Sequence, residues 1–114
     1  MDSILDTVKY ICNITPDCTD FDVPLILHTN SIISTVNQFG VGKEGFEITG
    51  NTETWNDFLG EETVDTKWVK SYIPLRVWLI FDANGITAST KDAIKEEIRE
   101  LEFRFFIEKD NEEE

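Results

Sequence analysis

Residues 24–40 have the sequence PLILHTNSIISTVNQFG, and this stretch decides the fold class. Its inward-facing positions follow the three-to-four-residue spacing of one helix face, and they are Leu25, Thr29, Ile32, Val36 and Phe39, with Ile26 and Ile33 beside them. Pro24 is tolerated in a first helical turn, where its missing N–H has no partner to lose. Gly40 stands where helices favour a left-handed closing residue. We expect a helix that Asp20 or Asp22 caps and that Gly40 ends.

A shorter helix is expected before this one, and a central helix after it. Ser3 is a typical N-cap residue, with Asp6 three positions further on. The apolar positions behind this cap have helical spacing and are Ile4, Leu5, Val8, Ile11 and Cys12. The segment from about 64 to 81 is apolar on most sides, which is typical of a helix that other helices surround. Pro74 inside it removes one backbone hydrogen bond and predicts a kink.

The last helix is expected to begin at Ser89 or Thr90. Its core-facing positions are spaced by three or four residues and are Ile94, Ile98, Leu101 and Phe105. The chain then ends in a strongly acidic stretch, EKDNEEE. We therefore expect a single helical domain over residues 1–108 and an acidic C-terminal tail over residues 109–114.

Residues 40–63 hold five of the six glycines and separate two of the expected helices. Residues 46–49 alternate apolar and polar side chains, which favours a short strand or one arm of a hairpin. Residues 54–60 are typical of one capped helical turn, in which Thr54 and Asp57 bond reciprocally and Gly60 ends the turn. The sequence therefore predicts an all-α protein. It is a compact bundle of three longer helices and a short one, with a long glycine-rich loop or short hairpin between helices two and three.

The charge of the chain narrows the classes of partner. Asp and Glu number 23 against 10 Lys and Arg, so the formal net charge is −13. Affinity for DNA comes chiefly from neutralising phosphates, so sequence-specific DNA binding and attachment to anionic membranes are both disfavoured. The longest apolar run, residues 77–81, is far shorter than the ~20 residues that cross a bilayer. An acidic N-terminus also predicts no signal peptide.

Motifs for catalysis or for metal binding are missing from the sequence. His28 is the single histidine and has no motif around it. Cys12 and Cys18 are interpreted as two reduced, partly buried side chains, although a disulfide between them stays open. The acids over 17–22 do not have the spacing of a calcium loop. The glycines over 40–45 follow a helix and lack the Lys-Ser or Lys-Thr pair of a phosphate loop, so no cofactor is expected.

Aromatic side chains are unusually dense near the C-terminus. Five large apolar residues lie within seven positions, and they are Leu101, Phe103, Phe105, Phe106 and Ile107. Adjacent helix positions differ by about 100°, so these five cover more than one face. Leu101 and Phe105 can enter the core of the domain. Phe103 and Phe106 point elsewhere, either into a groove of the same domain or, as we favour, into a contact with another subunit.

Five stretches of the chain also match a known family in order. They are 37–42 (NQFGVG), 45–48 (GFEI), 54–60 (TWNDFLG), 69–82 (VKSYIPLRVWLIFD) and 97–104 (EIRELEFR). Together they resemble the head–tail connector (adaptor) proteins of long-tailed bacteriophages and related prophages. The sequence departs from the family pattern at 82–84, where a proline is expected soon after the aspartate.

The resemblance implies a structural virion protein without enzymatic activity or cofactor. Its subunits would form a homo-oligomeric ring, commonly of twelve copies, below the portal protein in the head–tail neck. The ring would extend the channel through which genomic DNA passes without specific binding. It would also dock a head-completion (stopper) or tail protein. Assembly would take place in the host cytoplasm, with no membrane involved.

Two sets of residues are candidates for these contacts. The first is the end of the last helix, a portal or subunit interface of Leu101, Phe103, Phe106 and Ile107. The second is the glycine-rich loop, a mobile segment expected to become ordered on assembly and to face the channel or a neighbour through Val41, Lys43, Glu44, Phe46 and Glu47. The alternative function is a monomeric acidic regulator or DNA mimic that binds a cationic partner.

Overall fold

The computed structural model describes residues 3–60, 67–81 and 87–113, with side chains as far as residue 104 in the last range. These residues form five helices and no strand, which confirms the predicted all-α class. The helices are α1 (Ile4–Ile11), α2 (Asp22–Gln38), α3 (Trp55–Leu59), α5 (Val69–Phe81) and α6 (Ala88–Glu113). Helix α6 continues through the expected acidic tail to Glu113. Residues 61–66 and 82–86, which include the expected start and closing turn of the central helix, lie outside the described residues.

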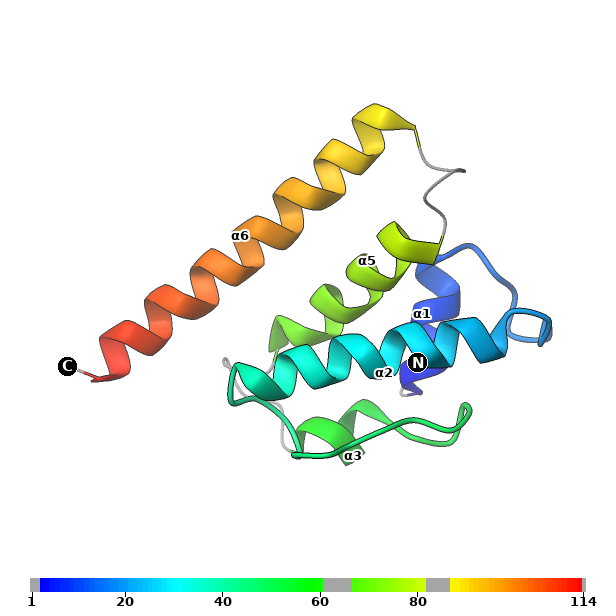
Figure 1. Ribbon diagram of the computed structural model, residues 1–114, viewed down its shortest axis with the longest axis horizontal. Helices are drawn as coiled ribbons and strands as arrows, with labels where there is room; N and C mark the ends of the chain where they lie inside the picture. The colour runs from blue at the N-terminus through cyan, green and yellow to red at the C-terminus, as the bar shows by residue number, and fades with distance from the viewer. Residues whose placement is uncertain (1–2, 61–66, 82–86, 114) are drawn as a thin grey trace.

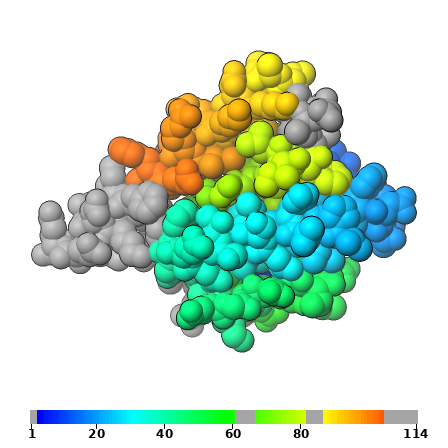
Figure 2. Space-filling view, in the orientation of Figure 1, coloured from blue at the N-terminus to red at the C-terminus, as the bar shows by residue number. Residues whose placement is uncertain are grey.

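Helix α5 is the centre of the bundle, as its apolar sequence predicts. It packs against α1, α2 and α6, and α2 runs antiparallel to it across the front of the view in Figure 1. Its fully buried residues are Val69, Tyr72, Ile73 and Val77. In Figure 2 the first half of α6 lies along one side of α5 and α2 lies along the other, with part of α5 visible between them. Because three helices contact α5, its apolar side chains supply much of the core.

Local capping residues set most of the helix ends. The Ser3 hydroxyl accepts a hydrogen bond from the Asp6 N–H at 3.3 Å, as predicted. Gly40 closes α2 with a φ of 85°, and its N–H donates to the Asn37 carbonyl at 2.9 Å. The next N–H, that of Val41, reaches back to the Val36 carbonyl at 3.3 Å. These two bonds form a Schellman motif, whose usual apolar contact is made here by Val36 and Val41 in the core.

Two predicted caps are wrong, because another contact is available at each site. Phe21 occupies the N-cap position of α2 and makes no side-chain capping bond. Asp22 lies inside the first turn, with its carboxylate 2.6 Å from the Lys9 ammonium group. At the start of α6, the Thr87 hydroxyl accepts a hydrogen bond from the Thr90 N–H at 3.2 Å. That geometry makes Thr87 the capping residue, in place of Ser89 or Thr90.

The strand expected over residues 46–49 does not form, and the loop alternative is correct. Residues 41–53, here called the loop, are irregular and lead into α3. The Ile4 N–H donates to the Glu53 carbonyl at 3.1 Å, which ties the end of the loop to α1. Helix α3 starts with the predicted capping box of Thr54 and Asp57. The loop and α3 therefore lie along the side of α2 that is away from α6 (Figure 1).

Candidate functional site

Two asparagines of α2 hold the loop. The Asn30 side chain donates to the Ile48 carbonyl at 3.0 Å and accepts from the Ile48 N–H at 2.7 Å. The Asn37 amide donates to the carbonyls of Val41 and Lys43, both at 3.1 Å. Residues seven positions apart lie on the same face of a helix. The two amides therefore bind the loop backbone as a neighbouring strand would.

Apolar contacts hold the loop from its other side. The rings of Phe46 and Phe58 lie 5.1 Å apart between their centroids, and the Lys43 N–H donates to the Phe58 carbonyl at 2.8 Å. Gly42 has a φ of 81°, and a Cβ atom there would overlap the Phe58 ring. Both the left-handed backbone and the close ring thus require glycine at this position.

A carboxylate closes the far end of the loop. Glu53 accepts hydrogen bonds from the Thr49 N–H at 3.1 Å, the Thr49 hydroxyl at 2.7 Å and the Gly50 N–H at 3.3 Å. Burial tends to raise the pKa of Glu53, but these hydrogen bonds favour the ionised carboxylate, and the pKa lies below its usual value of 4.5. This end of the loop is therefore held by a charged acceptor.

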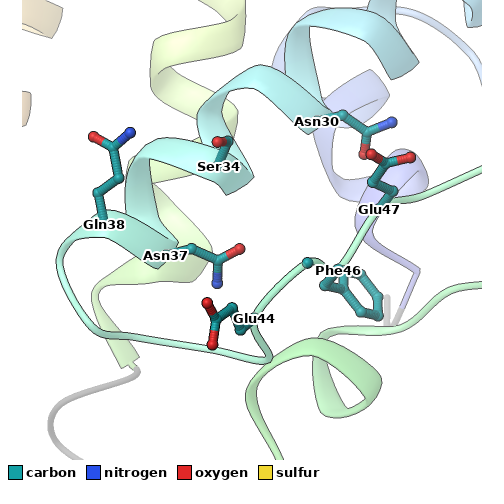
Figure 3. A pocket seen from close by; sticks show the side chains of 8 residues that line it. Asn30, Ser34, Asn37, Gln38, Glu44, Phe46 and Glu47 are labelled. Carbon is teal, nitrogen blue, oxygen red and sulfur yellow. The ribbon is translucent and has the colours of Figure 1, made fainter.

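An open pocket of about 440 Å³, here called the loop pocket, lies between α2 and the loop. Its helical wall is made of Asn30, Ser34, Asn37 and Gln38, and its loop wall includes Glu44, Phe46 and Glu47 (Figure 3). No lysine or arginine lines it. The pocket is therefore polar and negatively charged, and it suits a cationic side chain.

The five loop residues predicted to face the channel or a neighbour differ in their exposure to solvent. Lys43, Glu44 and Glu47 are exposed, and Phe46 is half-buried against Phe58. Val41 is only 7% exposed, because it is the apolar partner in the Schellman motif that ends α2. Its side chain is therefore not on the surface of the isolated subunit.

The opposite side of the α2–α5 pair carries the contacts of α6. Ile94 and Ile98 are buried and Leu101 is half-buried against the core. The Tyr72 hydroxyl donates to the Glu102 carboxylate at 2.9 Å and accepts from Arg76 at 3.1 Å. Burial, together with the bond to Glu102, raises the pKa of Tyr72 above 10.0. A short apolar stripe and one polar relay thus fasten α6 to α5.

A second pocket, here called the α5–α6 groove, has a volume of about 290 Å³. It is lined by Leu79 and Ile98 at its base and by Arg76, Lys95, Arg99 and Glu102. Three cations against one carboxylate make this groove positive on a chain whose net charge is −13. This site was not predicted from the sequence, although Lys95 and Arg99 stand four positions apart on one helix face and indicate one wall of it.

The end of α6 extends past the ends of α2 and α5 (Figure 1). Phe103 is 63% exposed there, whereas Leu101 reaches the core. Phe106 and Ile107 have helical backbone, but their side chains lie outside the described residues. The interface role of this set stays a prediction.

Two exposed apolar residues of α2 were also missed. Val23 and Leu27 are 79% and 69% exposed, four positions apart on the outer face of the helix. The helical spacing that placed Leu25 and Thr29 inward also placed these two outward.

In the described part of the chain, no group of three His, Cys, Asp or Glu side chains could hold a metal ion. Nor is any helix in that part long and apolar enough to span a membrane.

The fold and these surfaces define the class, a small all-α protein with two oppositely charged pockets and an overhanging C-terminal helix. The family follows from comparison with known proteins. The model of the phage connector protein family matches residues 4–112, and the chain belongs to this family. No curated protein and no solved structure matched the chain.

Family membership confirms the resemblance found in the sequence. The family is structural, and it implies a component of the phage neck, where portal and tail proteins are the partners. The pockets described above are therefore interpreted as candidate docking surfaces in a protein assembly.

Proposed function

We propose that this chain is a head–tail connector subunit that forms a closed ring below the portal. The ring extends the DNA channel and presents a docking surface to the next stopper or tail protein. The match to the phage connector family supports this function. The observation that carries it is the 26-residue helix α6, whose described contacts with the bundle reach as far as Leu101 and Glu102 and whose C-terminal end extends past the ends of α2 and α5 (Figure 1). A helix of that length spans about 39 Å, so its second half can reach a partner.

The exposed end of α6 is the proposed contact with the portal or with a neighbouring subunit. Phe103 is largely exposed in the subunit, and Phe106 and Ile107 follow on the same helix. Burying one Phe side chain stabilises a contact by ~1.5–3 kcal/mol. Two such anchors are enough to make this helix end a centre of binding. Leu101 belongs to the same surface only through its exposed part.

The charge of the chain suits a channel that DNA crosses without binding. A formal net charge of −13 repels the phosphate backbone. The exposed carboxylates Glu44 and Glu47 of the loop are the proposed channel-facing or neighbour-facing groups. In this function the chain has no enzymatic activity and needs no cofactor. It is assembled in the host cytoplasm and stays in the virion neck.

Native mass spectrometry and electron microscopy test this proposal directly. The protein is measured at high concentration, alone and mixed with the portal protein of the same phage. We expect a closed homo-oligomer, of twelve copies on a twelve-fold portal. A chain that stays monomeric in the presence of portal contradicts the proposal.

The alternative is a monomeric acidic regulator that mimics DNA, and only the net charge of −13 favours it. A mimic needs carboxylates spread along its exposed faces. Here the α5–α6 groove gathers three cations instead. Size-exclusion chromatography separates the two functions, since a ring is about ten times heavier than the 13.1 kDa chain.

A further inference from the structure

The loop pocket and the α5–α6 groove carry opposite charge. Glu44 and Glu47 stand at the loop pocket, which has no cation in its lining. Arg76, Lys95 and Arg99 stand at the groove, with one carboxylate among them. One chain therefore presents an anionic hollow and a cationic hollow at the same time.

The two hollows also lie on opposite sides of the subunit. Helix α5 lies between α2 and α6, since it packs against both. In Figure 1 the loop lies on the side of α2 away from α5, and α6 lies on the other side of the α2–α5 pair. The loop pocket is lined by α2 and the loop, and the groove by α5 and α6, so the two are on opposite sides of that pair. A head-to-tail ring needs two different complementary surfaces on each subunit. In a ring of about twelve, neighbours differ by a rotation of only ~30°, so those surfaces must lie nearly opposite each other.

We propose that the ring closes by docking the α5–α6 groove of one copy onto the loop pocket of the next. This inference rests on the proposed ring and names the surfaces that form it. Lys95 and Arg99 of one subunit meet Glu47 and Glu44 of its neighbour. The occupant of each pocket is thus a second copy of this chain.

Arg76 and Glu102 of the groove are engaged with Tyr72, but the four charged groups proposed to pair are available for such a contact. Glu44, Glu47 and Lys95 make no ion pair or hydrogen bond within the described part of the chain. Arg99 has only an exposed partner, Glu96, at 3.4 Å. An exposed pair of this kind contributes little to stability, so exchanging it for an intersubunit pair is cheap.

The loop pocket also offers polar groups that fit a guanidinium. Ser34 and Gln38 are exposed on its helical wall and provide oxygen acceptors beside the two carboxylates. A guanidinium carries five donors in a planar fork and uses such acceptors together. Asn30 and Asn37 are already bonded to the loop, so the wall is held in place before docking.

Charge reversal on each side tests the pairing. The first variant is Glu44→Lys with Glu47→Lys, and the second is Lys95→Glu with Arg99→Glu. Each variant alone has two hollows of the same sign and should form no ring, with or without portal. An equimolar mixture of the two should form rings in which the variants alternate, and these rings should hold an even number of subunits. The quadruple variant exchanges the charges, keeps the net charge of −13, and should form rings by itself.

The matched control is Asp17→Lys with Asp20→Lys, which changes the net charge as the first variant does but lies on the exposed segment between α1 and α2. This control should still form rings. Circular dichroism of every variant should match the unchanged chain, because all the altered side chains are exposed.

The outcomes separate this inference from the proposed function. If the unchanged chain forms rings and both charge-reversed variants do so too, the pairing is wrong and the connector function stands. If the variants fail but neither the mixture nor the quadruple variant recovers rings, the pairing is also wrong. Failure of the control would assign the effect to net charge and overturn the pairing. A chain that forms no ring even with portal overturns both proposals.

Discussion

The loop over 41–53 and helix α6 flank the α2–α5 pair on opposite sides, and different forces hold them there. The loop is held by side-chain hydrogen bonds to its backbone, from Asn30, Asn37 and Glu53, in addition to its buried residues Val41 and Ile48. Helix α6 is held by the apolar stripe of Ile94 and Ile98 and by one side-chain relay. The difference arises from where the backbone N–H and C=O groups of each segment find hydrogen-bond partners. A helix satisfies its own N–H and C=O groups, whereas an irregular loop must find partners elsewhere.

The two segments should therefore be sensitive to different substitutions. A loop that depends on a few polar contacts should fail when one donor is removed or one close approach is blocked. A helix that supplies its own hydrogen bonds should tolerate changes on its free face. The predictions that follow test this contrast, in order of decreasing effect on stability.

The largest effect is expected for Gly42→Ala in the loop. An alanine there meets both a left-handed backbone, which costs about 1–2 kcal/mol, and the buried ring of Phe58, where overpacking costs about 1–3 kcal/mol. The matched control is Gly45→Ala, since Gly45 has a φ of 76° but no atom within 4 Å of the added Cβ. Urea unfolding should show a loss of about 2–5 kcal/mol for the first variant and only about 1–2 kcal/mol for the second. Equal losses would show that the Phe58 contact is unimportant.

Asn30→Ala should come next, because it removes both side-chain bonds to the Ile48 backbone. Leaving a buried donor or acceptor without a partner costs about 1–3 kcal/mol. Hydrogen exchange at the Ile48 amide should become faster, while amides of α5 keep their protection. Ser34→Ala, on the exposed part of the same face, should change stability by less than about 0.5 kcal/mol. An unchanged rate of hydrogen exchange at the Ile48 amide in the Asn30→Ala variant would show that the Asn30 hydrogen bonds do not hold the loop.

A smaller effect on stability is expected for Phe103→Ser with Phe106→Ser at the end of α6. Phe103 is exposed in the subunit, so unfolding free energy should fall by less than about 1 kcal/mol while binding to the portal is lost. Ile98→Ala is the contrast within the same helix. Ile98 is buried, and removing it should cost about 2 kcal/mol or more. If the double Phe variant unfolds instead, both residues belong to a core, and the docking role is wrong.

The smallest effect concerns pH and the loop alone. The folded pKa of Glu53 lies below 4.5, so its hydrogen bonds contribute stability that is fully present above about pH 4.5 and is lost as the pH falls through the folded value. Amide resonances of Thr49 and Gly50 should shift over that range, and Glu53→Gln should abolish the shift. A titration at these amides that persists in the Gln variant would assign it to another group.

The fold was largely predictable from sequence, and the loop shows where prediction stopped. Period-2 alternation over 46–49 suggested a strand, but a strand needs a partner with free backbone groups. The nearest neighbour of the loop is α2, whose backbone is already bonded, so the Asn30 side chain takes the place of a partner strand at Ile48. Alternation alone cannot distinguish these two cases.

The candidate site was predicted only in part, for a related reason. The exposed position of Phe103 and the acidic loop could be inferred from helical spacing and composition. The complete α5–α6 groove could not, because the spacing of Lys95 and Arg99 shows only one wall of it, while Arg76 lies 19 positions before Lys95 and is brought there by helix packing. The same holds for Asp22, which looked like a helix cap and instead pairs with the buried Lys9 of α1.

The sequence by itself determined the helices, the caps at Ser3 and Thr54, and the glycine that closes α2 at Gly40. Each of these depends on contacts within about one helical turn, so the local residues are sufficient to specify them. Only the tertiary structure decided that Val41 turns into the core and that the loop binds Asn30. It also decided that opposite charges gather on opposite sides of the α2–α5 pair. Those features join residues from separate helices, and their positions follow from how the apolar faces pack together, which no local pattern records.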